Sequence, residues 1–347
     1  MRLHFSHPGV RRIWTVELRP QPGGPVLVCQ QCTHDSRLLD GPSARAEALA
    51  HLALHARRTP VPPHLRTCQC HERGCCWHRR HRGCQGPIRL LLARERGGRL
   101  WRLTDACTAC AAATSEAAVV PDTILTAAAT SSGRANTRRR RCPKGPDSQT
   151  RVREMLNYLA AALPAETGAG ARMLALQCAL RMNESAQVRL PCGVLRSLRL
   201  ESATDSWREL NEAGLLRTFP SDKRAVAVQI LDAGLLTQHP ARPDRLRAAD
   251  WAMRSVCRAR ASSIPLLQLA ALFIVARTTR GSGHGMTDMD QMARECGFPA
   301  GALPPLLNQL VEVGVLTTWQ VAPEAGDLSW TLGPNGIYPE SVTNESN

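Results

Sequence analysis

The stretch LPCGVLRSLRLESATDSWRELNEAGLLRTFPSDKRAVAVQIL, residues 190–231, decides the fold of the second half of the chain. Residues 193–198 can form a short helix, and Ser202 can cap a second helix whose apolar residues recur at i, i+4 and i+7 from Ala203. Gly214 ends that helix. The runs LLRTF and AVAVQI then have the composition of strands, with the charged turn PSDKR between them. The stretch therefore predicts two helices followed by a β-hairpin.

This order of elements resembles the winged helix-turn-helix of many bacterial regulators, over residues 169–236. The resemblance implies that the second helix reads bases while the first helix and the hairpin tip contact phosphates. The residues expected to bind DNA are Arg196 and Arg199 beside a phosphate strand, Ser202, Thr204, Asp205 and Arg208 on the reading helix, and Lys223 and Arg224 on the hairpin tip. Because Asp205, Glu209 and Glu212 would repel phosphate, a winged helix that contacts only protein is the alternative.

The pattern occurs a second time near the C-terminus. ELNEAGLLRTF at residues 209–219 matches QLVEVGVLTTW at residues 309–319, which indicates two related domains. In the second copy Pro304 and Pro305 must occupy the first turn of a helix. The face that would read DNA carries almost no basic side chains there. We therefore expect the C-terminal unit to bind a protein partner or to form a homodimer, with DNA reading as the lesser alternative.

Cysteine and histidine pairs near the N-terminus have the spacing of metal ligands. The runs RIWTVELR and PVLVC predict a hairpin, and an alanine- and leucine-rich stretch predicts a helix over residues 44–58. The expected ligands are Cys29, Cys32, His51 and His55. Their type and order are similar to a C2H2 zinc finger over residues 11–58, although 18 residues separate the two pairs. His34 is an alternative ligand, and a pair of buried thiols beside surface histidines is the interpretation without metal.

A second set of ligands surrounds the run PIRLLLARERGGRLWRL, which predicts two strands joined at a Gly-Gly turn. CQCHERGCCWHRRHRGC, residues 68–84, precedes it, and CTAC, residues 107–110, follows it. Cysteine pairs on both sides of a hairpin look like a zinc ribbon, whose small core depends on the metal. The expected ligands are Cys68, Cys70, Cys75, His78, Cys84, Cys107 and Cys110. Because Cys76 and His81 also compete, the pairing and the number of zinc ions stay open.

Together these patterns predict an α+β, multidomain chain in which small zinc-stapled ββα and zinc-ribbon-like modules precede two mainly α winged-helix units. The expected divisions are a C2H2-like module at 1–60, a zinc-ribbon-like module at 61–128, a basic flexible linker at 129–150, winged units at 151–240 and 241–332, and a disordered tail at 333–347. The linker is poor in apolar residues, so we expect it to be a tether whose arginines at 138–141 touch phosphate.

The distribution of charge favours double-stranded DNA as the partner of the basic part. The net charge is +15, and residues 1–150 hold 24 basic and 10 acidic side chains. Residues 151–260 hold 17 and 11, and residues 261–347 hold 3 and 8. All basic residues except Lys144 and Lys223 are arginine, so part of this excess reflects a GC-rich genome. The acidic C-terminal part is a poor binder of polyanions.

Other classes of protein find little support in the sequence. No segment has about 18 consecutive apolar residues, and the N-terminus lacks the apolar core of a signal peptide, so we expect a cytoplasmic protein without a membrane partner. Cysteines interspersed with histidines indicate metal binding rather than disulfides. Catalytic serine, phosphate-loop and dinucleotide motifs are missing. Glu72 is the one acid inside the second cluster, which favours closed, structural zinc, and we expect no enzyme activity.

The pattern from CQC through CCWH, RGC and RLWRL to CTACAAA also resembles uncharacterised actinobacterial proteins that pair a zinc ribbon with a helix-turn-helix segment. The resemblance implies an architecture and no particular activity. The sequence thus favours a DNA-binding transcriptional regulator with structural zinc sites. The alternative is a zinc-dependent protein-interaction or assembly factor that binds the transcription machinery rather than DNA.

Overall fold

The structure is a computed structural model of the whole chain, and it is described here over part of its length. The described residues are 11–32, 37–39, 44–59, 61–62, 65–70, 84–114, 116–120, 147–183, 185–200, 204–222, 225–236, 242–258, 264–322 and 327–336. The fold class is α+β, as predicted. Within these ranges, every helix is too short or too polar to cross a membrane.

The chain forms two compact units. Unit 1 comprises residues 1–145, 212–216 and 230–240, and unit 2 comprises residues 146–211, 217–229 and 241–347. In the part of the chain that the structure describes, unit 1 contains one six-stranded sheet, and unit 2 contains two three-stranded sheets.

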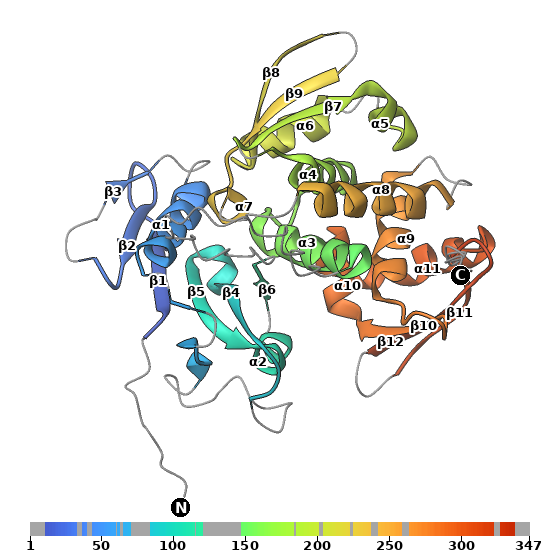
Figure 1. Cartoon of the computed structure of the whole chain (residues 1–347), viewed down its shortest axis with the longest axis horizontal. Coiled ribbons are helices and arrows are strands. Elements are labelled where there is room, and N and C mark those ends of the chain that lie inside the picture. Colours follow the sequence, from blue (N-terminus) through green and yellow to red (C-terminus); the bar gives the residue numbers. More distant parts are fainter. Residues whose placement is uncertain are drawn as a thin grey trace, which may run out of the picture. The chain divides into compact units, whose positions relative to one another are not determined.

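Unit 1 is built on one six-stranded antiparallel sheet with the order β3-β2-β1-β5-β4-β6 (Figure 1). The strands are β1 Ile13–Arg19, β2 Val26–Cys29, β3 Arg37–Leu38, β4 Ile88–Glu95, β5 Leu100–Cys107 and β6 Ala117–Val119. The short turn η4, Arg96–Gly98, joins β4 to β5, and its Gly97 and Gly98 have positive φ. The two predicted hairpins, β1 with β2 and β4 with β5, are therefore confirmed.

The division into two separate zinc modules at 1–60 and 61–128 is not what the structure has. β1 pairs with β2 on one edge and with β5 on the other, so a single sheet joins both stretches. Side chains of β1 and β5 are buried along almost their whole length, on both faces of the sheet. A strand buried in this way needs a neighbour on each edge to satisfy its backbone groups. The central pair β1·β5 supplies that neighbour.

The α-helices among the described residues of unit 1 are α1 Ala44–Arg58, α2 Thr108–Ala113 and α7 Ala233–Leu236. The bounds of α1 are those expected from the sequence. It packs on β1, β2 and β5 through Ala48, Leu49 and Leu52, which are almost fully buried. The short helix α7 packs on α1, and its first turn is capped by the Asp232 carboxylate, which accepts from the N–H of Leu235 at 2.8 Å.

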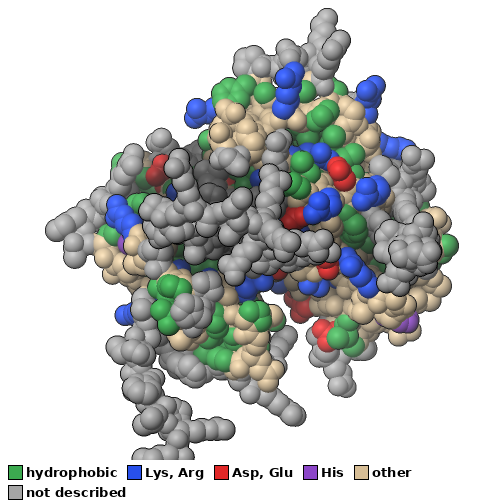
Figure 2. Space-filling model, viewed as in Figure 1, with side chains coloured by type: hydrophobic (Ala, Val, Ile, Leu, Met, Phe, Trp, Pro, Cys, Tyr) green, Lys and Arg blue, Asp and Glu red, His purple; other side chains and the backbone are tan. Residues whose placement is uncertain are grey.

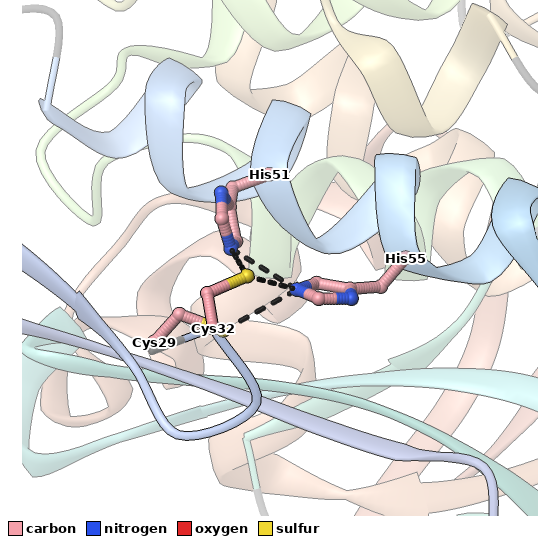
Figure 3. A group of neighbouring side chains, drawn as sticks. All are labelled: Cys29, Cys32, His51 and His55. Carbon is pink, nitrogen blue, oxygen red and sulfur yellow. Dashed lines mark hydrogen bonds between the residues drawn. The ribbon is translucent and has the colours of Figure 1, made fainter. Parts of the chain in front are cut away.

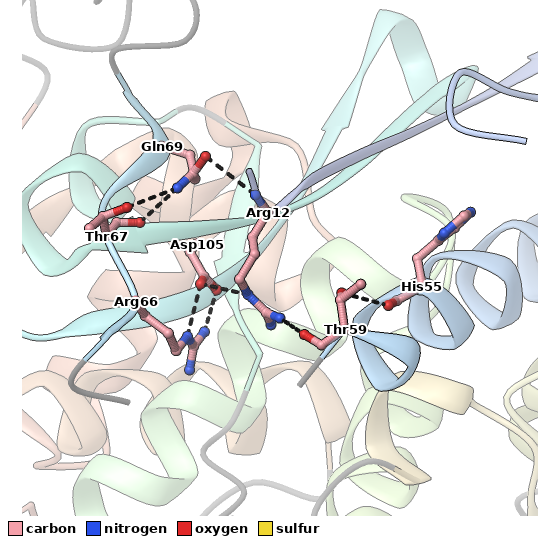
Figure 4. Close-up of polar contacts among 7 residues, drawn as sticks. All are labelled: Arg12, His55, Thr59, Arg66, Thr67, Gln69 and Asp105. Carbon is pink, nitrogen blue, oxygen red and sulfur yellow. Dashed lines mark hydrogen bonds and ion pairs between the residues drawn. The ribbon is translucent and has the colours of Figure 1, made fainter. Parts of the chain in front are cut away.

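A buried ion-pair cluster ties the sheet to the segment that leads to Cys68 (Figure 4). Asp105 on β5 is fully buried, and its carboxylate accepts from the Nε atoms of Arg12 at 2.8 Å and Arg66 at 2.9 Å. Arg12 also donates to the carbonyl of Thr59, just past the end of α1. Because Asp105 pairs with Arg12 and Arg66, and Arg12 also reaches Thr59, the cluster links ligand-bearing segments that lie far apart in sequence.

Unit 2 contains the same order of elements twice. The first repeat consists of α3 Ser148–Ala162, α4 Ala169–Arg181, β7 Gln187–Pro191, α5 Cys192–Ser197, α6 Thr204–Glu212, β8 Leu216–Asp222 and β9 Ala225–Ile230. The second repeat consists of α8 Arg242–Arg258, α9 Pro265–Arg277, β10 His284–Asp288, α10 Met289–Cys296, the turn η5 Ala300–Ala302, α11 Leu303–Glu312, β11 Leu316–Val321 and β12 Asp327–Leu332. The predicted duplication is confirmed, and it extends to a preceding helix pair and an edge strand.

The sheets of the two repeats have the same topology, β7-β9-β8 and β10-β12-β11, with the third strand in the middle. Helices α3, α4, α8 and α9 pack on one another and form the shared core of unit 2 (Figure 1). α4 and α9 are apolar on nearly all sides and buried along almost their whole length. A helix that is apolar all round must be covered all round, and in this fold each repeat's helices cover those of the other.

Some residues of the predicted flexible linker and of the predicted disordered tail belong to the folded part of the structure. Residues 147–150 belong to the start of α3, where the Asp147 carboxylate caps the helix by accepting from the N–H of Thr150 at 2.8 Å. At the other end, the N–H of Gly333 donates to the carbonyl of Val315 at 2.8 Å, so the chain stays attached to the sheet as far as Gly336. The rest of both segments, including the arginines at 138–141, lies outside the described residues.

Candidate metal centres

The first candidate metal centre brings together the four N-terminal ligands expected from the sequence. The ligand atoms of Cys29, Cys32, His51 and His55 all lie within 4.8 Å of one another. The Nε2 atom of His55 is 3.3 Å from each cysteine Sγ and 3.1 Å from the Nε2 of His51. Figure 3 shows the two imidazoles pointing from α1 toward the thiols. This group, the cysteine-histidine centre, can therefore hold one metal ion.

Local structure positions each pair of this centre. Cys29 ends β2 and Cys32 lies in the turn after it, while His51 and His55 are one helical turn apart on α1. Burial lowers the pKa of His55, and His51 and Arg58 lower it further because a second positive charge nearby is unfavourable. The imidazole is thus kept neutral at pH 7, which is the form that binds metal.

The second candidate centre, the four-cysteine centre, is made of sulfur alone. The Sγ atoms of Cys68, Cys84, Cys107 and Cys110 lie within 4.8 Å of one another. Cys68 comes from the segment before the predicted hairpin, Cys84 lies four residues before the start of β4, Cys107 ends β5, and Cys110 lies in α2. The Sγ of Cys110 is 3.5 Å from that of Cys68 and 3.8 Å from that of Cys84. The β4·β5 hairpin is thereby held between its cysteine pairs, as expected.

Backbone hydrogen bonds prepare the four-cysteine centre for negative charge. The N–H of Cys107 donates to the Sγ of Cys68 at 3.3 Å, and the N–H of Cys110 donates to the Sγ of Cys107 at 3.4 Å. Burial works against ionisation of Cys107, but the hydrogen bonds from Cys110 and Gln85 outweigh it and lower its pKa to about 7. Burial raises the pKa of Cys110, which has three other sulfurs around it. A divalent cation would relieve that crowding of negative charge.

Three other expected ligands have different outcomes. Cys70 is buried and lies beside the centre, with its Sγ 3.2 Å from that of Cys84, but the four-sulfur group does not include it. The four-sulfur group instead includes the Sγ of Cys68, two residues earlier. Cys75 and His78, like the alternative ligand His34, lie outside the described residues.

The residues expected to bind DNA lie on the first repeat. Arg196 and Arg199 are exposed on and just after α5, and Thr204 and Asp205 are exposed at the start of α6. Arg208 is also exposed, but it pairs with Asp205 at 2.8 Å, one turn earlier on the same helix. Ser202, Lys223 and Arg224 lie outside the described residues.

Two further basic residues of the first repeat escaped the sequence analysis. Arg189 on β7 and Arg217 on β8 are exposed. The alternation in Gln187–Pro191, where Val188 and Leu190 are buried and their neighbours exposed, was the signal that could have identified β7 as a strand. In the view of Figure 2, the side chains coloured as charged over β7, β8, β9 and α5 are mainly basic among the described residues, whereas both kinds alternate over the helices below.

Comparison with protein-family models, with curated protein sequences and with solved structures gives no match.

Proposed function

We propose that both centres bind zinc as a structural ion. Zinc bonds of about 2.3 Å to sulfur and about 2.05 Å to nitrogen give tetrahedron edges of about 3.3 Å between nitrogens, about 3.5 Å between nitrogen and sulfur, and about 3.8 Å between sulfurs. The separations in the cysteine-histidine centre are 3.1 Å between nitrogens and 3.3–3.5 Å between nitrogen and sulfur. Sulfur atoms in the four-cysteine centre are 3.5 and 3.8 Å apart. These distances support ligand sets of the size that zinc requires.

Elemental analysis of the purified, reduced chain tests this proposal directly. We expect about two equivalents of zinc, one for each centre, because the ligands come from segments that the small sheet alone holds weakly. Less than about half an equivalent after gentle purification would contradict it.

We further propose that the protein is a DNA-binding transcriptional regulator whose two repeats are winged helices. Support comes from the element order of each repeat, in which a helix and an edge strand precede two helices and a hairpin. In such a fold, α5 and α6 of the first repeat form the helix-turn-helix, and β8 with β9 forms the wing. Zinc then has a structural role in unit 1, and the first repeat holds the duplex.

The observation that carries this proposal is the unequal distribution of arginine between matching positions of the repeats. Arg189, Arg199 and Arg217 of the first repeat stand where the second repeat has Met286, Gly297 and Thr317. All three arginines are exposed, and they lie on the edge strand, after the first helix of the pair and on the first strand of the hairpin. Elements that share one fold and differ in surface charge differ in the partner they attract.

A binding experiment on random duplex DNA across a salt series tests the proposal. Each phosphate contact contributes about −0.9 to the slope of log K against log salt. We expect a slope of about −2.7 or steeper, from three or more such contacts. Absence of binding at about 50 mM salt would exclude DNA as the partner.

A second function, binding of a protein of the transcription machinery, is favoured by the surface of α6. Its exposed charged residues are Asp205, Arg208 and Glu212, and Arg208 is already paired with Asp205. Helix α11 exposes Asn308, Gln309 and Glu312 and no basic side chain within its bounds. If neither helix reads bases, DNA is held through phosphates alone, and the second repeat is available for a protein partner or a second copy of the chain.

A further inference from the structure

Among the described residues, the four-cysteine centre has one more sulfur beside it than a tetrahedral ion can use. Cys70 is fully buried next to the four ligands, in the same apolar cluster as Cys107 and Cys110. Its Sγ is 3.2 Å from the Sγ of Cys84, closer than the 3.5 and 3.8 Å that separate sulfurs within the ligand set. Because zinc in structural sites takes four ligands, one thiol remains uncoordinated at contact distance from a ligand.

The two close sulfurs differ in access to solvent. Cys84 is exposed, whereas Cys107 and Cys110 are buried and Cys68 is partly buried. A small oxidant in solution therefore reaches Cys84 before the other ligands. Cys70, whose Sγ lies 3.2 Å from that of Cys84, is fully buried.

We propose that Cys84 and Cys70 form a peroxide-sensitive modification site, in which Cys84 is the reacting thiolate and Cys70 is the resolving thiol. The inference rests on the proposed zinc occupancy of the four-cysteine centre. A zinc ion held by these four sulfurs would keep its cysteine ligands as thiolates, which are the nucleophilic form of cysteine. The substrate is hydrogen peroxide or a small organic hydroperoxide.

The oxidation takes two steps, and the peroxide is the one reactant that it needs besides the two cysteines. The Cys84 sulfur attacks one peroxide oxygen, the O–O bond breaks, and hydroxide leaves, so that Cys84 becomes a sulfenic acid. The Cys70 thiol then attacks this sulfur: the S–S bond forms, the S–O bond breaks, and the Cys70 proton leaves with the hydroxyl as water. The cysteine pair loses two electrons, and the peroxide gains them. The centre thereby loses Cys84 as a ligand.

The cysteine-histidine centre provides a contrast within the same sheet. Among the described residues, its thiols are Cys29 and Cys32, and both belong to the ligand set. Oxidation there lacks a spare buried thiol to complete a disulfide without using a second ligand. We therefore expect peroxide to open the four-cysteine centre first and to leave the cysteine-histidine centre loaded.

The test begins with the full-length, reduced protein, whose zinc content is measured before any oxidant is added. Hydrogen peroxide is then titrated while a metallochromic dye reports released zinc, and peptides are mapped after free thiols have been blocked. We expect one of the two zinc ions to be released, together with a disulfide between Cys70 and Cys84 that is two hydrogens lighter than the free pair. A chain that holds no zinc before oxidation refutes the zinc proposal itself, whereas a loaded chain that forms no such disulfide refutes only this inference.

Two variants complete the test. Cys70→Ala should bind as much zinc as the wild type but should release it several-fold more slowly and form no Cys84 disulfide. Cys192→Ala, which removes a partly buried cysteine of unit 2, should behave as the wild type. The proposal is overturned if Cys70→Ala binds one zinc ion fewer, because Cys70 is then a ligand, or if it releases zinc as fast as the wild type.

Discussion

The two repeats of unit 2 share the order and topology of their helices and strands, and they differ in the side chains at matching positions. α4 and α9 both have 13 residues and both end in an arginine, Arg181 and Arg277. Arg181 pairs with Asp250 at 2.7 Å, and this carboxylate is 54 % exposed. Arg277 pairs with Glu295, whose side chain is only 2 % exposed, and lies 3.8 Å from the ring centroid of Phe273. The arginine at the end of this helix thus forms a partly exposed ion pair in the first repeat and a buried ion pair in the second.

The turn after the first helix of the pair shows the same divergence. Both copies end this helix with a residue in the left-handed region, Arg199 with φ 54° and Gly297 with φ 65°. Glycine adopts this conformation without strain, whereas an arginine there costs about 1–2 kcal/mol. The first repeat thus has a charged side chain at a strained backbone position, whereas the second repeat has the residue that this backbone conformation favours. Strain of this kind is typical of positions kept for binding.

The largest effect on stability is expected where the second repeat has buried its charges. Burial raises the pKa of Glu295, and Arg277 opposes that rise. In Arg277→Met the carboxylate loses its partner, so its pKa rises further. With a raised pKa, the folded state binds the Glu295 proton more tightly than the unfolded state does. The free energy of unfolding is therefore kept below the ordinary pKa of 4.5 and falls as the pH rises above it. Urea unfolding should show Arg277→Met near the wild type at pH 4 and about 3–5 kcal/mol less stable at pH 7.

The matched change in the first repeat is Arg181→Met. Its partner Asp250 is half exposed, so the loss of unfolding free energy should be about 1 kcal/mol or less. Equal losses at Arg181 and Arg277 would show that the two repeats do not differ in the way described.

Glycine and arginine at the left-handed turn provide a second matched pair. A Cβ added at Gly297 would lie 2.6 Å from the backbone oxygen of Thr167 and 2.5 Å from the Nε of Arg172. Gly297→Ala should therefore destabilise the protein by about 2 kcal/mol or more, from crowding added to left-handed strain.

The opposite sign is expected at the first repeat. Arg199→Gly should raise the unfolding free energy by about 1 kcal/mol because it removes the strain, while weakening DNA binding. Thermal unfolding and DNA affinity measured on the same preparation check both. If Arg199→Gly lowers stability, the arginine is retained for packing rather than for binding.

Sequence alone predicted the features that depend on local spacing. The helix 44–58 was predicted with its observed bounds because alanine and leucine fill it, and the four-residue spacing of His51 and His55 placed both on one face. The β1·β5 pairing was not predictable, since it joins residues near 15 to residues near 102 and no local pattern specifies which edges meet. The choice of Cys68 over Cys70 likewise depends on the path of the chain between distant strands, which the ion pairs of Asp105 fix.

The most direct test of the division of labour between the repeats is a comparison of two charge-matched double variants in DNA binding. Arg196→Ala with Arg199→Gly removes two exposed arginines from the first repeat, and Arg280→Ala with Arg294→Ala removes two from the second. Fluorescence anisotropy on random duplex across a salt series should show that the first variant loses about two units of log–log salt slope, whereas the second keeps the slope of the wild type. Equal losses of slope, or a loss confined to the second variant, would contradict the account.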